Sequence, residues 1–307
     1  MSKKNLNGRS VISIADLTKD EIEHVLKRAA EFKKKPPKEL LRGQILASCF
    51  FEPSTRTRLS FESAMLRLGG QVIGFSDAAS TSIRKGESLY DSMKVTGSLA
   101  DLIVIRHPME GAARLASLAT TKPVINAGDG ANQHPTQTLL DLFTIKECQG
   151  KLEGLKVAIV GDLKYGRTVH SLASAAALFD MRLYFISPEE LTLPETILKQ
   201  LRKLRGKFSF HHNVEEVIDK IDILYMTRIQ KERFDDATYE KVKESYILKE
   251  AQLKKAKSHL RVLHPLPRVN EIEVAIDSTP HAYYFEQAEN GLFVREALLA
   301  LILGKIN

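Results

Sequence analysis

The stretch FEPSTRTRLSFE, residues 51–62, places hydroxyl and guanidinium groups where a predicted strand passes into a predicted helix. An apolar run at 45–51 leads into these groups and predicts a buried strand. A helical pattern follows and stops at Gly69 and Gly70, so the predicted helix ends at Leu68. Five consecutive residues of the two polar types, 54–58, therefore lie at the start of a helix.

The start of a helix favours anions. Its first N–H groups have no acceptor inside the helix, and the macrodipole is positive at this end. Ser54 is a good N-cap, and Thr55 and Thr57 add hydroxyl donors. Arg56 adds a planar guanidinium that matches a phosphate group. The stretch therefore predicts a phosphate-binding turn, with a capped helix bearing exposed arginines as the alternative.

The rest of the chain alternates strands with helices, a rhythm that indicates parallel sheets. We predict an α/β protein of two domains, each a parallel sheet flanked by helices, joined by two helices with the active site in the cleft. The first domain is expected over 1–134, a linking helix over 135–149 and the second domain over 150–289. The C-terminal helix, within 290–307, is expected to be buried against the first domain, because its pattern at 294–303 is apolar nearly all round. The predicted strands are 45–51, 71–75, 102–106, 124–126, 157–160, 182–186, 208–211, 223–226 and 260–263.

Composition excludes several classes of protein. Two cysteines, Cys49 and Cys148, are too few for a disulfide framework or a zinc site built on cysteine. The N-terminus has no apolar stretch behind its charges, and the longest apolar run near the end, 297–303, is far short of a membrane span. We therefore expect a cytoplasmic protein with no membrane contact.

The formal net charge of +7 raises the alternative of a nucleic-acid-binding protein. No predicted helix carries a continuous basic stripe, and basic residues gather instead at a few loop positions. This distribution suits small anionic ligands, so we expect no nucleic-acid partner.

Further polar clusters follow other predicted strands. Arg106 and His107 come directly after the strand at 102–105, and His134 with Gln137 follows the strand at 124–126. Two prolines stiffen the turn HPLPRVNEI after the strand at 260–263. Because ligands bind beyond the carboxyl ends of parallel strands, these clusters are expected to converge on one site.

The segment VAIVGDLKYGRTVHSL, residues 157–172, is superficially similar to a dinucleotide-binding turn. However, the spacing G-x-G-x-x-G is absent, since only Gly161 and Gly166 are present, with charged residues around them. A nicotinamide-dependent dehydrogenase is therefore disfavoured, and we predict no cofactor and no bound metal.

The motifs PSTRTRLSFE, RHPMEG, HPTQTLLDL, GDLKYGRTVHSL, YMTRIQKER and HPLPRVNEI together resemble those of the aspartate carbamoyltransferase catalytic chains, within the aspartate/ornithine carbamoyltransferase family. The resemblance runs from about residue 44 to residue 300, in the order of the family. It implies a carbamoyl phosphate-binding first domain and an aspartate-binding second domain. The implied reaction joins carbamoyl phosphate to L-aspartate, giving N-carbamoyl-L-aspartate and phosphate, a step of pyrimidine biosynthesis.

The resemblance also implies roles for individual residues. The ligands of carbamoyl phosphate would be Ser54, Thr55, Arg56, Thr57, Ser82, Arg106, His134, Gln137, Leu266 and Pro267. The ligands of aspartate would be Lys85, Arg167, Arg228 and Gln230. Of these, Arg56, Thr57, Lys85, Arg106 and His134 would act in catalysis. One departure concerns the loop TSIRKGES, which is one residue shorter between its serine and lysine than a common family form, so Ser82 is assigned less securely than Lys85.

The chemistry agrees with these roles. Attack of an amine on a carbonyl carbon gives a tetrahedral intermediate whose oxyanion needs donors in place, and Thr57, Arg106 and His134 are suited to this. No covalent nucleophile is required. The residues leave the general base open between His134 and a phosphate oxygen; the phosphate oxygen is preferred, with His134 as a donor. The alternatives are an ornithine carbamoyltransferase and a non-enzymatic anion-binding protein of the same fold.

Assembly is a further expectation. Residues 75–88 form a long polar loop with Lys85 near its tip, and the family resemblance implies that Lys85, with Ser82, reaches a site of the neighbouring subunit in a homotrimer. The alternative is an exposed lysine on a surface loop. The sequence leaves open whether separate regulatory chains bind this one.

Overall fold

The structure of the chain is a computed structural model that describes residues 5–77, 81–229 and 246–307. The chain forms two compact units, residues 1–143 with 289–307 and residues 144–288. The division falls inside helix α5 (Pro135–Gln149) and inside helix α9 (Tyr284–Ile302), so each of these helices contributes to both units. No helix in the described part of the chain has both the length and the apolar character that a membrane crossing requires.

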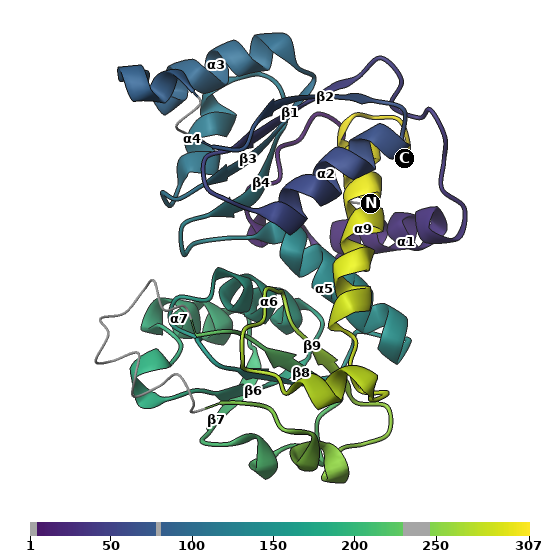
Figure 1. Cartoon of the computed structure of the whole chain (residues 1–307), viewed down its shortest axis with the longest axis vertical. Coiled ribbons are helices and arrows are strands. Elements are labelled where there is room, and N and C mark those ends of the chain that lie inside the picture. The colour runs from purple at the N-terminus through teal and green to yellow at the C-terminus, as the bar shows by residue number, and fades with distance from the viewer. Residues whose placement is uncertain (1–4, 78–80, 230–245) are drawn as a thin grey trace. The chain divides into compact units, whose positions relative to one another are not determined.

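Unit 1 contains a four-stranded parallel sheet in the order β2-β1-β3-β4, as the alternating pattern predicts (Figure 1). Its strands are β1 (Ile45–Phe50), β2 (Gln71–Phe75), β3 (Leu102–His107) and β4 (Val124–Asp129). Its helices are α1 (Lys19–Lys34), α2 (Thr55–Arg67), α3 (Leu89–Leu99) and α4 (Ala112–Ala119), with parts of α5 and α9.

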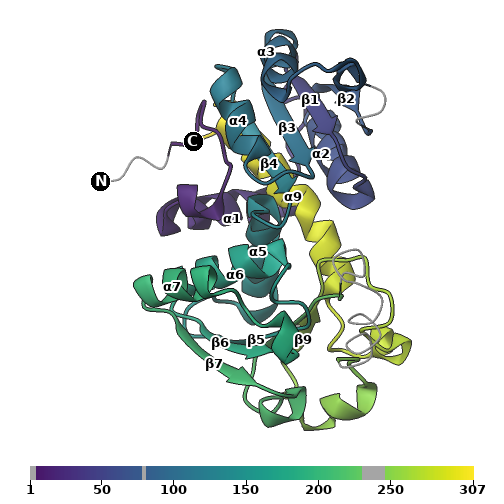
Figure 2. The same ribbon diagram turned by 90° about the vertical axis from the view of Figure 1, so that its left-hand side faces the viewer.

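Helices cover both faces of this sheet. Figures 1 and 2 show α3 and α4 along one face and α2 along the other. The face toward α3 and α4 is an apolar cluster in which small alanines of α4 let the helix lie close to β3. The opposite face includes Ser48, whose hydroxyl donates to Glu62 of α2 at 2.9 Å. Strands β1, β3 and β4 are therefore largely buried on both sides, as parallel strands usually are, whereas the edge strand β2 is partly exposed.

Unit 2 contains a five-stranded parallel sheet in the order β7-β6-β5-β8-β9. Helices α6 (Arg167–Leu178) and α7 (Glu195–Lys203) lie along one face (Figure 2). The other face packs against short 3-10 helices, among them Val214–Glu216 and Glu250–Lys255, which bury Val214 and Leu253. Its strands are β5 (Lys156–Val160), β6 (Arg182–Ile186), β7 (Lys207–His211), β8 (Ile223–Met226) and β9 (Arg261–Leu263).

Each sheet has one point where its strand order reverses. In unit 1 the chain leaves β1 toward β2 but leaves β3 toward β4, so the reversal lies between β1 and β3. In unit 2 it lies between β5 and β8 for the same reason. Connections diverge at such a point and leave the carboxyl ends of the two strands open, which is where ligands bind in parallel sheets.

Most predicted elements have the expected ranges, and a capping box formed by Thr18 and Glu21 begins α1. The last helix differs, because α9 begins at Tyr284 and not near 294. Polar residues in its first turns interrupt the apolar pattern, so the sequence does not indicate that the helix begins there. Gly291 reflects close packing in this helix, since a Cβ there would lie 3.1 Å from Leu140 Cδ2 of α5 and 2.4 Å from Arg295 Nη1.

Helix α9 is buried, as predicted, but it is not apolar all round. Arg295 and Glu296 are both buried within unit 1. Arg295 donates to Ser60 Oγ at 3.0 Å and stacks over the Phe61 ring, and burial lowers its pKa to about 10. Neither carboxylate oxygen of Glu296 has a hydrogen-bond partner in the described structure, and burial raises its pKa to about 7, opposed by Arg67. This carboxyl group is therefore costly to ionise in the folded chain.

Replacing Glu296 by Gln should remove a pH-dependent loss of stability. Because the folded pKa lies above the unfolded one, the folded chain holds the proton more tightly, so wild-type stability falls as pH rises from about 4.5 to about 7. We expect Glu296→Gln to raise the urea midpoint at pH 8 and to change it little at pH 5. Glu289→Gln, at an exposed position of α9, is the matched control. Equal pH dependence in the wild type and Glu296→Gln would show that Glu296 does not carry this effect.

Candidate active site

The turn between β1 and α2 lies at the reversal point of the first sheet. Ser54 is the N-cap of α2, as predicted, but its side chain makes no capping hydrogen bond. The first turn of α2 carries no acidic residue, although acidic groups favour this position, and it carries Arg56 instead. Thr55 and Arg56 are exposed, whereas Thr57 is buried. A helix start built in this way lacks its usual intramolecular anion and is suited to bind one from outside.

Arg106 lies beside this turn, on the neighbouring strand. It pairs in register with Phe50, and its carbonyl accepts the N–H of Phe51 at 2.8 Å. Its Nε is 2.7 Å from a carboxylate oxygen of Glu52, and its Nη1 donates to the carbonyl of Ala127 at 3.4 Å. The guanidinium is therefore fixed between the ends of three strands and points to the same edge as the α2 turn.

His107, which follows Arg106 in the sequence motif, has a structural role. Its Nδ1 accepts the N–H of Met109 at 3.0 Å, and its ring lies against Phe51 with the ring centroids 4.9 Å apart. Burial lowers the pKa of His107, although Glu52 and Asp129 oppose this. The imidazole thus closes the turn after β3 as a neutral acceptor.

His134 and Gln137 lie at the start of α5. The carbonyl of His134 accepts the N–H groups of Gln137 and Thr138, so His134 is the first residue of the helical hydrogen-bond pattern, with Pro135 in the position that proline favours. Both His134 and Gln137 are buried, with 4% and 8% of their surface exposed. These side chains follow β4, which neighbours β3 in the sheet.

The amide of Gln137 has a fixed orientation. Its Nε2 donates to Asp141 Oδ1 at 2.8 Å, one turn further along α5, and Asp141 is fully buried. A carboxylate accepts hydrogen bonds and cannot donate them, so the nitrogen of Gln137 must face Asp141. The amide oxygen is therefore the group that Gln137 presents to a ligand, and it can accept an N–H.

Unit 2 repeats the arrangement of unit 1 at its own reversal point. Arg167 is the first residue of α6, whose N-cap, Gly166, offers no side chain and whose first turn has no acidic residue. Arg228 follows β8, the strand next to β5, and both arginines are partly buried. The two turns approach closely, because a Cβ on Gly161 would lie 2.4 Å from the carbonyl oxygen of Thr227. Only glycine fits there, and its φ of 116° is also one that glycine favours.

The turn after β9 is held by a buried histidine. His264 is 1% exposed; its Nδ1 accepts the N–H of Leu266 at 2.8 Å, and its Nε2 lies 2.7 Å from Glu271 Oε1. The bond at Nδ1 assigns the proton to Nε2, which donates to Glu271. Burial alone would raise the pKa of Glu271, but the hydrogen bonds from His264 and from the N–H of Val269 hold it below its usual value. This pair fixes Leu266, which has a positive φ of 52°.

Ser82 and Lys85 lie in a short 3-10 helix, Ser82–Lys85, within the segment expected to be a loop. Both are exposed, and within the described residues the side chain of Lys85 takes part in no hydrogen bond or ion pair. Gln230 lies outside the described residues. The remaining predicted site residues lie at the carboxyl ends of strands. In unit 1 they follow β1 and β4 or, for Arg106, lie near the end of β3, and in unit 2 they follow β5, β8 and β9.

Several supporting residues were not predicted. Glu52, Asp141 and Glu271 contact predicted site residues or fix their turns. The Gln137–Asp141 pair has the i, i+4 spacing of side chains that meet on a helix, so the sequence contains an indication of it. Glu271 shows no comparable pattern. Among the described residues, no group of three or more His, Cys, Asp or Glu side chains could hold a metal ion.

Two features of the chain define a class of protein, namely paired parallel-sheet units and anion-suited helix starts at both reversal points. The family described as "Aspartate/ornithine carbamoyltransferase, carbamoyl-P binding domain" matches residues 9–147, and its "Asp/Orn binding domain" matches residues 153–302. The chain belongs to the aspartate/ornithine carbamoyltransferase family.

Individual relatives cover nearly the whole chain. The aspartate carbamoyltransferase catalytic subunit of Chromobacterium violaceum is 56% identical over 97% of this chain and 98% of its own length. That of Vibrio cholerae is 57% identical over 98% of each chain. Among solved structures, the catalytic subunit of M. jannaschii aspartate transcarbamoylase has a TM-score of 0.89 at 51% identity, covering 96% of this chain and 98% of its own. The Trypanosoma cruzi aspartate transcarbamoylase in complex with carbamoyl phosphate and aspartate has a TM-score of 0.92 at 37% identity, covering 97% and 98%.

Replacing Arg56 by Gln should weaken the binding of inorganic phosphate at least tenfold, since a charge-assisted hydrogen bond to an anion contributes roughly 1.5–3 kcal/mol. Isothermal titration of the chain with phosphate measures the change. Arg58→Gln is the matched control, because Arg58 lies in the same first turns of α2 but faces Glu62 at 3.5 Å. Equal losses in the two variants would mean that general positive charge, and not the α2 turn, attracts the anion.

Proposed function

We propose that this chain transfers the carbamoyl group of carbamoyl phosphate to the amine of L-aspartate, which gives N-carbamoyl-L-aspartate and phosphate. The observation that carries the proposal is the repetition of one design: a helix start without a capping side chain or an acidic residue, bearing an arginine, in each unit. One such site suits a phosphate, and the pair Arg167 and Arg228 suits the two carboxylates of aspartate. The relatives named as aspartate carbamoyltransferase catalytic subunits support the same substrates.

Carbamoyl phosphate would be held by the unit 1 residues together with the turn after β9. The N–H groups and hydroxyls of Ser54, Thr55 and Thr57 and the guanidinium of Arg56 surround the phosphate, with Ser82 as a further ligand. Thr57, Arg106 and His134 face the carbamoyl oxygen. The oxygen of Gln137, oriented by Asp141, and the carbonyls of Leu266 and Pro267 accept the N–H groups of the carbamoyl amide.

The chemical step forms a C–N bond and breaks a C–O bond. The aspartate amine attacks the carbonyl carbon, and the oxyanion of the tetrahedral intermediate is stabilised by Thr57, Arg106 and His134. Collapse of the intermediate breaks the bond between carbon and the phosphate oxygen, and the departing phosphate takes the proton from the amine. Much of the acceleration comes from holding two anions together, an effect worth up to roughly 7–11 kcal/mol in well-oriented systems.

Aspartate would be held by Arg167, Arg228, Lys85 and Gln230. Ornithine carries a distal cation, which would need an acidic partner where unit 2 presents arginines. Aspartate is therefore favoured over ornithine. The biological role that follows is the synthesis of pyrimidines. Cys49 and Cys148 are free thiols, which supports a reducing compartment, and we infer a cytoplasmic location.

Turnover with labelled carbamoyl phosphate tests the proposed function against its alternatives. We expect carbamoyl aspartate from aspartate and little citrulline from ornithine. Arg228→Ala should raise the aspartate KM at least tenfold and lower kcat, because one clamp on a carboxylate is lost, while phosphate affinity stays unchanged. Arg182→Ala, at the start of β6 on the opposite edge of the same sheet, is the control. Efficient citrulline formation, or ligand binding without turnover, would refute the assignment.

We further infer that the active enzyme is a homotrimer in which Lys85, with Ser82, completes the site of a neighbouring subunit. Lys85 is exposed at the end of its 3-10 helix. Large apolar side chains are also exposed on elements of unit 1, among them Leu66 of α2 and Ile73 of β2, and such side chains favour a protein partner. Light scattering on protein from its native source would show the trimer and any regulatory chains bound to it.

Mixed trimers test whether the site is shared. Lys85→Ala and His134→Ala trimers should each be nearly inactive, because each lacks one group at every site. After mixing, unfolding and reassembly at equal amounts, about a quarter of the sites should combine an intact lysine from one chain with an intact histidine from its neighbour. Recovered activity near that fraction supports a shared site. Verified mixed trimers without activity would place Lys85 within its own chain or outside the reaction.

A further inference from the structure

We infer that Asp129 is a positioning residue that fixes two turns relative to each other: the turn that follows β3, the strand carrying Arg106, and the turn that leads to His134. The inference rests on the proposed function, which gives both side chains a role at the carbamoyl group. Asp129 is the last residue of β4, and only 1% of its surface is exposed. It lies five residues before His134 and is not itself a proposed ligand.

Each carboxylate oxygen of Asp129 accepts two hydrogen bonds. Oδ1 accepts from Asn126 Nδ2 at 2.8 Å and from the N–H of Gln133 at 3.1 Å. Oδ2 accepts from the N–H of Gly111 at 2.9 Å and from Asn132 Nδ2 at 3.0 Å. Gly111 is the N-cap of α4, at the end of the turn after β3, whereas Gln133 directly precedes His134. One buried carboxylate thus joins the two turns.

A second contact between the same turns involves Gly130. Its N–H donates to the carbonyl of His107 at 3.0 Å, directly after Arg106. Its φ is 52°, and a Cβ there would lie 2.6 Å from Glu110 Cγ and 3.0 Å from the carbonyl oxygen of Pro108. The two turns are therefore packed too closely for any other residue, so a change in one must move the other.

Asp129 is suited to this role because it is charged and fully satisfied. A carboxylate with four donors uses all of its acceptor positions, and hydrogen bonds to a charged group are about twice as strong as neutral ones. In Asp129→Asn one of the two oxygens becomes an NH2 group. Whichever way the amide is turned, that NH2 group faces two donors and cannot accept their hydrogen bonds. The variant would therefore lose the link to one turn even though it fills the same volume.

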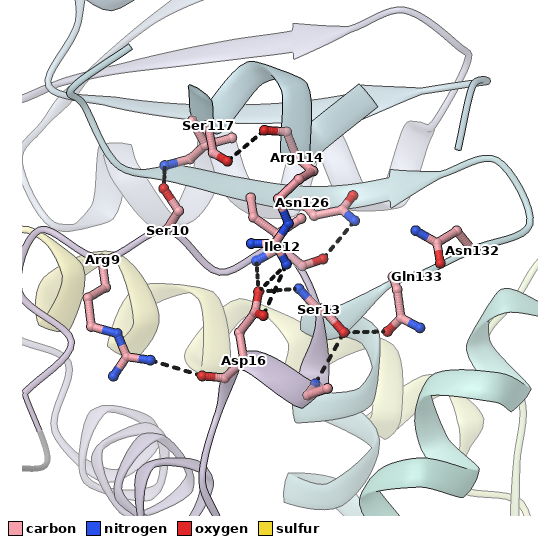
Figure 3. Close-up of polar contacts among 12 residues, drawn as sticks. Arg9, Ser10, Ile12, Ser13, Asp16, Arg114, Ser117, Asn126, Asn132 and Gln133 are labelled. Atoms are coloured by element: carbon pink, nitrogen blue, oxygen red, sulfur yellow. Dashed lines mark hydrogen bonds and ion pairs between the residues drawn. The ribbon is translucent and has the colours of Figure 1, made fainter. Parts of the chain in front are cut away.

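The N-terminal segment supplies a matched control. Figure 3 shows this segment beside β4, where Asn126 Nδ2 donates to the carbonyl of Ile12 at 2.9 Å. Asp16 Oδ2 accepts the N–H groups of Ile12 and Ser13 and lies 3.0 Å from Arg114 Nη2. Asp16 is a carboxylate with several donors, like Asp129, but its donors belong to the N-terminal segment and to α4. Asp16→Asn makes the same chemical change at a carboxylate that contacts neither turn directly, although Ser13, which it holds, donates to Gln133 Oε1 at 3.2 Å.

The test compares Asp129→Asn with Asp16→Asn in the full chain, well below the melting temperature of each. For Asp129→Asn we expect kcat to fall at least tenfold and the carbamoyl phosphate KM to rise, while the aspartate KM stays within about threefold, because the arginines of unit 2 are unaffected. For Asp16→Asn we expect a lower melting temperature and a kcat within about twofold of wild type. Equal kcat losses in the two variants, or none in Asp129→Asn, would overturn the inference.

A spectroscopic measurement separates this inference from the proposed function. In chain labelled with ¹³C at histidine, the His134 ring signal, identified by its loss in His134→Ala, should shift in Asp129→Asn and stay in place in Asp16→Asn. An unshifted signal overturns the inference whatever the activity. If the wild-type chain forms no carbamoyl aspartate while the His134 signal still shifts in Asp129→Asn, the proposed function is refuted and the inference about Asp129 stands.

If Asp129→Asn does not fold, Asn132→Ala replaces it. This change removes one donor to Oδ2 at an exposed residue and leaves the carboxylate in place. We expect a smaller kcat loss and a smaller His134 shift in the same direction. A folded Asn132→Ala with wild-type kcat and an unshifted His134 signal would count against the role of Asp129.

Discussion

Parallel strands in one sheet all end at the same edge, and each is followed by a helix that begins there. This constraint brings the positive ends of several helices together without any help from side chains. In both units the order of strands adds a reversal point, between β1 and β3 and between β5 and β8, where two connections diverge. The substrate-binding groups proposed here depend on that geometry, because Arg56, Arg106, Arg167 and Arg228 all lie at one of these two points.

The same constraint has a cost, which the surrounding residues offset. A helix start with an arginine and no capping side chain is less stable by itself than one with a capping aspartate. Turns that present ligands must also stay rigid although they lie outside regular structure. Buried polar pairs meet this need, since Asp141 orients Gln137 and Glu271 orients His264 beneath the turn after β9. Each is hydrogen-bonded, so its burial is tolerated.

The sequence predicts the fold well because strand and helix patterns in a parallel α/β protein are local and strong. The two parallel sheets appear as expected. The start of α9 was placed ten residues too late, because its first turns carry polar residues and depend on tertiary packing at Gly291. The proposed ligands could be named because they follow strands in recognisable motifs. The supporting residues are harder to predict, since the contact between Asp129 and Gly111 joins positions that no sequence spacing relates.

Unit 1 is not continuous along the chain, because it includes residues 289–307, which contain most of α9. A ribosome makes these residues last. Unit 2, a single stretch from 144 to 288, is complete before the helix that finishes unit 1 has emerged. The apolar surface that Val294 and Leu298 cover therefore stays open throughout translation of the second unit, although the rest of unit 1 was made first. Chains truncated near the C-terminus should consequently expose the core of the first-made unit and become substrates for chaperones and proteases.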